Sequence, residues 1–229
     1  MSPRTIAVVT AGLSQPSTSR LLADRLAAAT VRAAASSPDL GTDPSEFRWN
    51  HAKIHPENSG GGGDGRVEVR VIEVRDHARD VANHLVSGFP SPALKTALDT
   101  VAGADGVIAV APTFRASISG LFKSFVDVLD ENALAGKPML LGATGGSARH
   151  SLVLEHALRP VFTYMHAVCV PTSVFAATDD WAGPETARLH ARIERAAREF
   201  AFEIERRGPV VAADPFQLTT SFDRLLASE

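Results

Sequence analysis

The chain begins with a strand–loop–helix pattern, TIAVVTAGLSQPSTSR over residues 5–20. The segment from Thr5 to Val9 is mostly apolar, which is typical of a buried strand. A loop rich in glycine, proline and hydroxyl residues follows it. Beyond this loop, apolar residues recur at the spacing of one helix face, at Leu22, Leu26, Ala29 and Ala33. This order predicts the first βα unit of an α/β fold.

The rest of the chain repeats the alternation of apolar runs and helical patterns. Further strands are predicted at residues 67–74, 107–111, 139–143 and 168–170. The run at 67–74 alternates apolar and charged residues and suits a sheet edge, whereas those at 107–111 and 139–143 are continuously apolar and suit its centre. Two more helical stripes are Leu121, Phe125, Val128, Leu129 and Leu189, Ile193, Ala196, Phe200, Ile204. We therefore predict a three-layer, doubly wound, five-stranded parallel sheet of flavodoxin-like order 2-1-3-4-5, with ligands beyond the carboxyl ends of the strands.

Length and local composition predict the domain organisation. A chain of 229 residues suits one domain, residues 1–229. Residues 36–66 are rich in Ser, Pro, Asp and Gly and are expected to form a flexible insertion. Four consecutive glycines at 60–63 follow no strand and open no helix, so a linker is favoured over a phosphate loop. Residues 208–229 form a C-terminal tail whose apolar side chains pack either on the domain or on a neighbouring subunit.

Composition argues against several classes of protein. The net charge of −3 and the absence of a basic stripe argue against nucleic-acid binding. No apolar segment approaches the roughly 20 residues of a membrane span. The first apolar segment, residues 6–9, is too short for the core of a signal peptide, so we expect a cytoplasmic protein. The single cysteine, Cys169, excludes an intrachain disulfide and is expected to be a buried, inert thiol. The histidines lack metal-ligand spacing, and no metal site is expected.

The loop after the first strand is a candidate phosphate site. Its hydroxyls, with the free N–H groups and the dipole of the following helix, favour an anion, and the candidates are Ser14, Ser17, Thr18 and Ser19. Plain helix capping is the alternative, and the position after the first strand favours phosphate. The loop has neither G-x-G-x-x-G nor G-x-x-x-x-G-K-[ST], which argues against dinucleotide folds and NTPases. The strand ends also lack the acidic residues of a phosphorylatable receiver domain.

Two later loops complete the candidate cofactor site. The loop after the third predicted strand contributes Pro112, Thr113, Phe114 and Arg115, and the loop after the fourth contributes Thr144, Gly145, Gly146 and Ser147. Paired glycines let the backbone approach a flat ligand closely. Phe114 either covers a ring face or fills a gap in packing.

With these three loops in order, the sequence resembles the NADPH-dependent FMN reductases of the flavodoxin-like superfamily. The resemblance covers residues 4–205 apart from the 36–66 insertion. The family's Gly-x-Ser-x-x-x-Ser loop is approximated by residues 12–19. Its Pro-x-Tyr-Asn-x-Ser-x-x-Gly loop is matched by Pro112, Ser117 and Gly120, and its Gly-Gly loop by Gly145-Gly146. The stretches 143–151 and 174–181 resemble an actinobacterial branch of flavin reductases.

The resemblance implies FMN as cofactor and NADPH or NADH as co-substrate. Hydride passes from the nicotinamide to the flavin, so no catalytic triad is expected and the protein supplies binding and orientation. The family implies release of reduced FMN to a flavin-dependent monooxygenase and assembly as a homodimer or homotetramer. The apolar helix at residues 121–129 is expected either at a subunit interface or in the core.

Two residues depart from the family pattern, and they leave alternatives open. The family's Tyr is Phe114 here, and its Asn is Arg115. Arg115, Arg149 and His150 are candidates for binding NADPH. Arg115 suits an outward solvated position equally well, and a lone histidine such as His150 is more often structural. A quinone or azo-compound reductase, a flavodoxin-like electron carrier and a flavin sensor are the rival functions. Carriers are usually shorter and strongly acidic, which argues against that reading.

Overall fold

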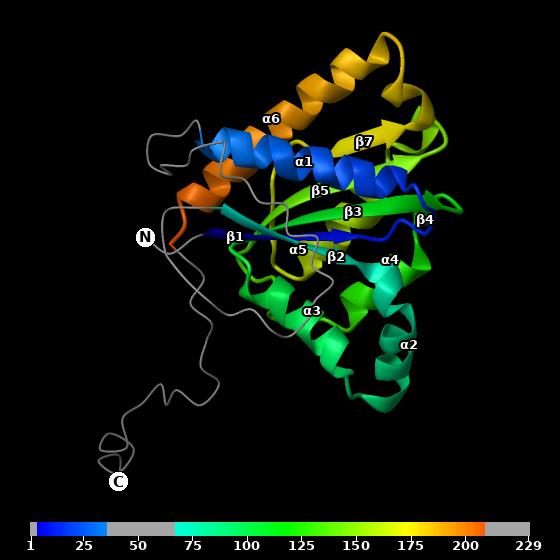
Figure 1. The fold of residues 1–229 in the computed structure, drawn as a ribbon, viewed down its shortest axis with the longest axis vertical. Helices are drawn as coiled ribbons and strands as arrows, with labels where there is room; N and C mark the ends of the chain where they lie inside the picture. The colour runs from blue at the N-terminus through cyan, green and yellow to red at the C-terminus, as the bar shows by residue number, and fades with distance from the viewer. Residues whose placement is uncertain (1–3, 36–66, 209–229) are drawn as a thin grey trace.

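The computed structural model describes residues 4–35 and 67–208 (Figure 1). Their principal parallel strands lie in the order β2-β1-β3-β5-β6, with β4 paired to β3 and β7 paired to β5. The predicted fold class and strand order are therefore confirmed, with β5 and the β6–β7 pair in the fourth and fifth positions. The bounds are β1 Arg4–Thr10, β2 Val67–Glu73, β3 Gly106–Phe114, β4 Ser117–Ile118, β5 Pro138–Gly145, β6 Val168–Cys169 and β7 Val174–Ala177.

Helices cover both faces of the sheet. Figure 1 shows α1 and α6 on one side and α2, α3 and α4 on the other. The α-helices are α1 Thr18–Ala35, α2 Ala78–Ser87, α3 Pro92–Gly103, α4 Gly120–Asp127, α5 Arg159–Tyr164 and α6 Glu185–Glu205. Shorter helical turns are η2 Val74–His77, η3 Ala148–His150, η4 Leu154–Leu158 and η5 Thr178–Trp181. Turn η4 is π-helical and lies just before Pro160, which has no N–H for a regular helical hydrogen bond.

Each face of the sheet has its own apolar core. On one face, Leu22 and Leu26 of α1 and Phe200 of α6 are fully buried with Val8 and Ile108. The opposite core includes Phe122 and Phe125 of α4 with Leu141, Leu158 and Phe162. Burial of each large side chain contributes about 1.5–3 kcal/mol. A sheet buried on both faces explains why its central strands are continuously apolar.

Side chains at the helix ends determine where several helices start and stop. The Oγ of Ser91 accepts a hydrogen bond from the N–H of Leu94 at 3.1 Å, with Pro92 in the first position of α3. Helix α2 ends at Gly88, whose φ of 78° is accessible to glycine at little cost.

The fifth predicted strand, residues 168–170, differs from the structure. Only Val168–Cys169 form a strand there, β6, which pairs with Pro138 and Met139. A separate strand, β7, pairs with the end of β5 and was not predicted. Pro171 lies in the gap between β6 and β7 and cannot donate a backbone hydrogen bond. The Arg159 guanidinium spans it, donating to the carbonyl of Val170 at 3.2 Å and to Oγ of Ser173 at 2.9 Å. Helices α2 and α3 and the hairpin strand β4 were also missing from the prediction.

Some predicted features cannot be compared with the structure. The insertion at 36–66 and all of the tail at 208–229 except Gly208 lie outside the described residues. Within residues 4–35 and 67–208, no helix has the length and apolarity needed to cross a membrane. The same part of the chain contains no group of three His, Cys, Asp or Glu residues placed to hold a metal ion. Cys169 is half-buried, and burial raises the pKa of its thiol.

A buried lysine joins α3 to β5. Lys137 is only 4% exposed, and its Nζ donates to the carbonyls of Val101 and Ala102 at 2.9 and 2.6 Å, at the carboxyl end of α3. Burial lowers the pKa of Lys137 to about 8, while the charge of Asp105 opposes that change. The lysine thus caps a helix but is held where its charge is poorly solvated.

This burial predicts a pH-dependent stability. Between pH 8 and the ordinary pKa of 10.5, the unfolded chain holds more protons than the folded one, so the free energy of unfolding rises with pH. We expect a rise of about 3 kcal/mol in the wild type, and no such rise in Lys137→Met. Urea unfolding of both proteins at several pH values would measure their free energies of unfolding. In the difference between the two proteins, the contributions of all other titrating groups cancel. Parallel pH profiles for the two proteins would contradict the prediction.

Candidate functional site

The three predicted site loops lie side by side at one edge of the sheet. Strands β1, β3 and β5 are adjacent and parallel, with Thr10 opposite Val110 and Pro112 opposite Thr144. Their carboxyl ends therefore meet at the same edge, towards the right of Figure 1. The segments at residues 11–17, 112–119 and 145–147 contain the last residues of β3 and β5 and the loops that follow the three strands. Ligands of doubly wound sheets bind at this edge.

The first loop closes tightly over the start of α1. The Oγ of Ser17 accepts a hydrogen bond from the N–H of Arg20 at 3.2 Å and so caps the helix. Gly12 is buried, and a Cβ on it would lie 1.7 Å from that Oγ, so only glycine fits without displacing the cap. The hydroxyl residues Ser14 and Thr18 are exposed beside the helix start. Ser17 therefore caps the helix, as the alternative prediction had it. Ser14 and Thr18 remain exposed to solvent at a helix N-terminus, which favours anions.

Two other predicted residues bond to each other. The hydroxyls of Ser19 and Thr144 share a hydrogen bond of 2.7 Å, and both residues are buried. This bond links the first turn of α1 to the end of β5. Their binding role remains a prediction, while their visible role is to hold the first and third loops in a fixed relation.

The second loop is a tight hairpin. Phe114 of β3 pairs with Ser117 of β4, and the two residues between them, Arg115 and Ala116, have φ values of 50° and 62°. Two positive φ angles are typical of a type I′ turn, which prefers Asn-Gly. Neither Arg nor Ala adopts this conformation readily. The hairpin exposes the Arg115 side chain and leaves Phe114 45% exposed.

Two threonine hydroxyls at the same edge have no partner. Oγ1 of Thr10, at the end of β1, and Oγ1 of Thr113, near the end of β3, are buried without a hydrogen bond. Buried polar atoms are nearly always bonded to protein or water. Pro112, by contrast, is buried and its carbonyl accepts from the N–H of Ser119 at 3.2 Å. The orphaned hydroxyls show that this edge has polar groups to offer a ligand or water.

In the third loop there is free space beside the backbone of Gly146 but not beside that of Gly145. A Cβ on Gly145 would approach Cζ of Phe175 to 3.0 Å, whereas one on Gly146 would meet nothing within 4 Å. The carbonyl of Ser147 accepts from the N–H of His150 at 3.2 Å and begins the turn η3. Arg149 and His150 are both exposed on this turn.

Charge is distributed unevenly over the site. Arg20 and Arg75, beside the first loop, form ion pairs with acidic residues. In the described part of the chain, by contrast, no carboxylate lies within ion-pair distance of Arg115 or Arg149. The second and third loops therefore present uncompensated positive charge, as a phosphorylated ligand requires.

The sequence analysis missed the contribution of β2. Glu73, its last residue, lies opposite Thr10, and the guanidinium of Arg75 donates to the carbonyl of Ser14 at 3.2 Å. A signal was available, because both charged residues lie at the carboxyl end of the strand predicted at 67–74. Charged side chains at that end of a parallel strand lie next to the loop of its neighbour.

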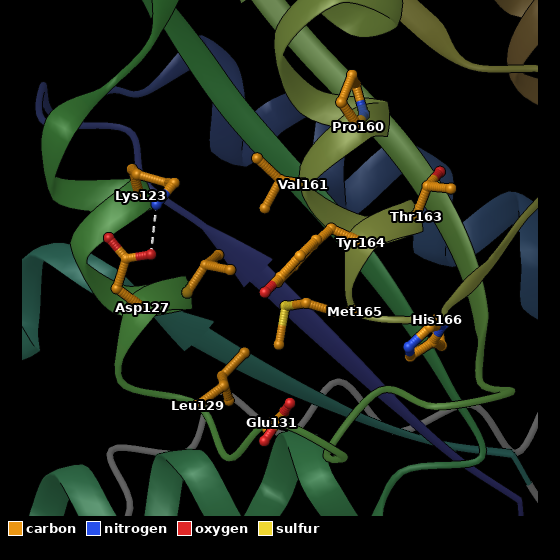
Figure 2. Close-up of a pocket in the computed structure, with 11 residues that line it drawn as sticks. Lys123, Asp127, Leu129, Glu131, Pro160, Val161, Thr163, Tyr164, Met165 and His166 are labelled. Atoms are coloured by element: carbon orange, nitrogen blue, oxygen red, sulfur yellow. Dashed lines mark hydrogen bonds and ion pairs between the residues drawn. The ribbon is translucent and has the colours of Figure 1, made fainter.

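A second concavity lies away from these loops, between α4 and α5 (Figure 2). It has a volume of about 690 Å³ and a mainly apolar lining that includes Val126, Leu129, Val161 and Met165. Tyr164 extends into it from α5, and Lys123 and Asp127 form an ion pair on α4. His166 also lines it, and its carbonyl accepts a hydrogen bond from the N–H of Gly136 at 2.9 Å.

Comparisons with known proteins point in one direction. A family model described as NADPH-dependent FMN reductase matches residues 4–182. The FMN reductase (NADPH) of Pseudomonas aeruginosa is 38% identical over 140 residues, covering 58% of this chain and 75% of that protein. The NADH-dependent FMN reductase SfnF of Pseudomonas fluorescens is 39% identical over 145 residues, covering 61% and 78%.

Solved structures agree with the sequence comparisons. An oxidoreductase from Corynebacterium diphtheriae superposes with a TM-score of 0.77 at 38% identity, covering 91% of this chain and all of that one. The apo form of an NADH:FMN oxidoreductase, EmoB, has a TM-score of 0.61 at 28% identity, covering 86% and 90%. The similarity therefore includes the strands and loops that form the candidate site.

The strained hairpin predicts a stabilising substitution. Ala116→Gly removes the Cβ from a position with a φ of 62° and is expected to raise the free energy of unfolding by about 1 kcal/mol. Urea denaturation without ligand would measure it. Ala191→Gly, at an exposed position inside α6, is the matched control and should lower stability by about 1 kcal/mol. Destabilisation by Ala116→Gly would show that the hairpin is not strained.

Proposed function

The chain belongs to the NADPH-dependent FMN reductase family, and from that premise we propose that its three carboxyl-edge loops hold FMN and that the enzyme releases reduced flavin to a separate flavin-dependent monooxygenase. Family membership makes the chain an NAD(P)H:FMN oxidoreductase. The flavin supplies the hydride-accepting ring when bound, and the protein supplies binding and orientation. We further propose that the monooxygenase is the acceptor of the reduced flavin and that the protein is cytoplasmic.

The first loop is proposed to bind the flavin phosphate. Exposed hydroxyls of Ser14 and Thr18 lie beside the N-terminus of the 18-residue helix α1, whose free N–H groups favour an anion. The exclusion of a Cβ at Gly12 keeps the loop close to that helix. This closure of the loop around a capped helix start is the observation that carries the proposal.

The second and third loops are proposed to surround the ring. The partnerless Oγ1 of Thr113 and the open backbone at Gly146 fit the polar edge and the flat face of an isoalloxazine. Phe114 is exposed enough to cover part of such a ring. Gly145 and Ser147 complete the turn around it. In this proposal these groups bind the ring and exclude water from it, and none of them transfers a proton.

Positive charge beside the ring site is proposed to receive the pyridine nucleotide. Arg115 and Arg149 are exposed without carboxylate partners in the described residues, and His150 adjoins Arg149. A guanidinium binds a phosphate through a planar pair of donors. Both NADPH- and NADH-dependent enzymes occur among the relatives, so these side chains are the candidates that set the preference.

Release of reduced flavin is favoured by the open character of the loops. Large apolar side chains are exposed on or beside all three of them, at Leu13, Phe114 and Leu152. A flavin held by exposed loops exchanges with solution more readily than one enclosed by the fold. Exchange is what supply to a separate oxygenase requires, whereas a quinone or azo-compound reductase retains its flavin.

The phosphate assignment predicts a selective loss of affinity. Wild-type protein should bind FMN more tightly than riboflavin, which lacks the phosphate, and Thr18→Ala should reduce that preference roughly fivefold through the lost hydrogen bond. Flavin titration followed by anaerobic NADPH addition measures affinity and then reduction as loss of visible absorbance. Thr186→Ala, in the first turn of α6, is the control and should change neither. An unchanged preference in Thr18→Ala contradicts the phosphate site, and flavin that stays oxidised contradicts the reductase.

The groove between α4 and α5 is proposed to be where two copies of the chain associate. It is apolar, Tyr164 within it is 83% exposed, and its lining contains the basic Lys123 with the acidic Asp127 and Glu131 (Figure 2). A two-fold interface brings the same patch against itself, so a patch with charges of both signs is self-complementary. The second copy is therefore the occupant that this lining favours.

Self-association through the groove predicts sensitivity to one added charge. Tyr164→Glu should convert the oligomer to a smaller species, because association would bury the new carboxylate against an apolar surface, which is energetically costly. Light scattering coupled to size-exclusion chromatography measures the mass. Phe202→Glu changes another exposed aromatic residue, on α6 across the sheet, and should leave the mass unchanged. A monomeric wild type, or an unaffected Tyr164→Glu, would contradict this interface.

A further inference from the structure

Four charged side chains alternate in sign beside the first loop. They run from Arg75, just after β2, through Glu73 at the end of β2 to Arg20 and Asp24 on α1. Glu73 forms ion pairs with both arginines, and Nε of Arg20 donates to Asp24 at 2.7 Å. All four side chains are no more than about a third exposed.

This row of charges, which we term the brace, holds the phosphate loop at two points. At one end the guanidinium of Arg75 donates to the carbonyl of Ser14 at 3.2 Å. At the other, Arg20 connects Glu73 to the first turn of α1, where its own N–H is bonded to the capping Oγ of Ser17. Because Glu73 lies opposite Thr10 in the sheet, the brace ties the loop to the edge strand.

The brace has no surplus positive charge to offer a phosphate. The two arginines are matched by Glu73 and Asp24, and Asp76 lies 3.7 Å from Arg75. Its effect on an anion at the loop must therefore come from geometry rather than from attraction. A guanidinium that contacts a loop carbonyl and a carboxylate together fixes the loop through several directed donors, which a point charge does not.

We infer that Arg75, oriented by Glu73, is a positioning residue that holds the first loop in the shape that receives the flavin phosphate. The inference rests on the proposed function of that loop. The hydrogen bond from Arg75 to the carbonyl of Ser14 holds the loop that carries the exposed residues Ser14 and Thr18 beside the helix start. The strand β2 thereby contributes to cofactor binding without touching the cofactor.

Flavin titrations of single variants test the inference. Arg75→Met should lower the preference for FMN over riboflavin roughly tenfold, through loss of a charge-assisted contact that orders the loop. Riboflavin affinity should be unchanged, which a general loss of structure would not allow. Arg70→Met is the matched control: Arg70 lies on the same strand and pairs with Glu68 at the surface, so its preference should equal that of the wild type.

A second variant separates positioning from attraction. Glu73→Gln keeps the side-chain shape but frees two arginines from their shared carboxylate. A positioning role predicts a weaker preference for FMN, whereas attraction by the arginines predicts a stronger one, so an unchanged or stronger preference overturns the inference. An unaltered preference in Arg75→Met overturns it as well. If Thr18→Ala still reduces the preference in that case, the phosphate site stands and only the role of Arg75 falls.

Discussion

Parallel pairing of β1, β3 and β5 is the constraint on which the rest of this structure depends. Parallel strands bring their carboxyl ends to one edge, and each must be followed by a crossover that returns over a face of the sheet. The helices that make these crossovers bury both faces and provide two apolar cores. The loops between strands and helices are left at a single edge, where residues more than 100 positions apart, such as Ser19 and Thr144, come within hydrogen-bond distance.

Several departures from local preference lie at the site, although others, such as the φ of 58° at His166, lie away from it. The capped helices, the continuously apolar central strands and the glycine at the end of α2 all agree with their surroundings. At the carboxyl edge, by contrast, Arg115 and Ala116 adopt positive φ angles and two threonine hydroxyls are buried without partners. Departures of this kind persist where the surrounding structure imposes them, and they concentrate at functional sites.

Charge divides the site into a neutral part and a positive part. Beside the first loop, Arg20 and Arg75 form ion pairs with carboxylates, and Arg75 also donates to the carbonyl of Ser14. On the second and third loops, Arg115 and Arg149 have no such partners in the described residues and remain free to meet a charged ligand. In the proposed function, the loop at the start of α1 binds the flavin phosphate, and the exposed guanidinium groups bind the pyridine nucleotide.

The sequence by itself determined the fold class and the position of three candidate loops after three strands, because periodicity and loop chemistry are local properties. The strand order 2-1-3-4-5 was predicted from likeness to flavodoxin-like folds, because local patterns do not say which strands lie side by side. Residues such as Ser17 and Gly146 were named as candidates from their neighbours in the chain alone, and their binding role remains a prediction. The tertiary structure decided what depends on long-range contacts. It placed β6 and β7 on either side of Pro171, turned Ser19 and Thr144 towards each other, and brought Arg75 to Ser14 across 61 residues. Side-chain pairing between distant segments follows from how strands and helices stack, and no local pattern encodes that stacking.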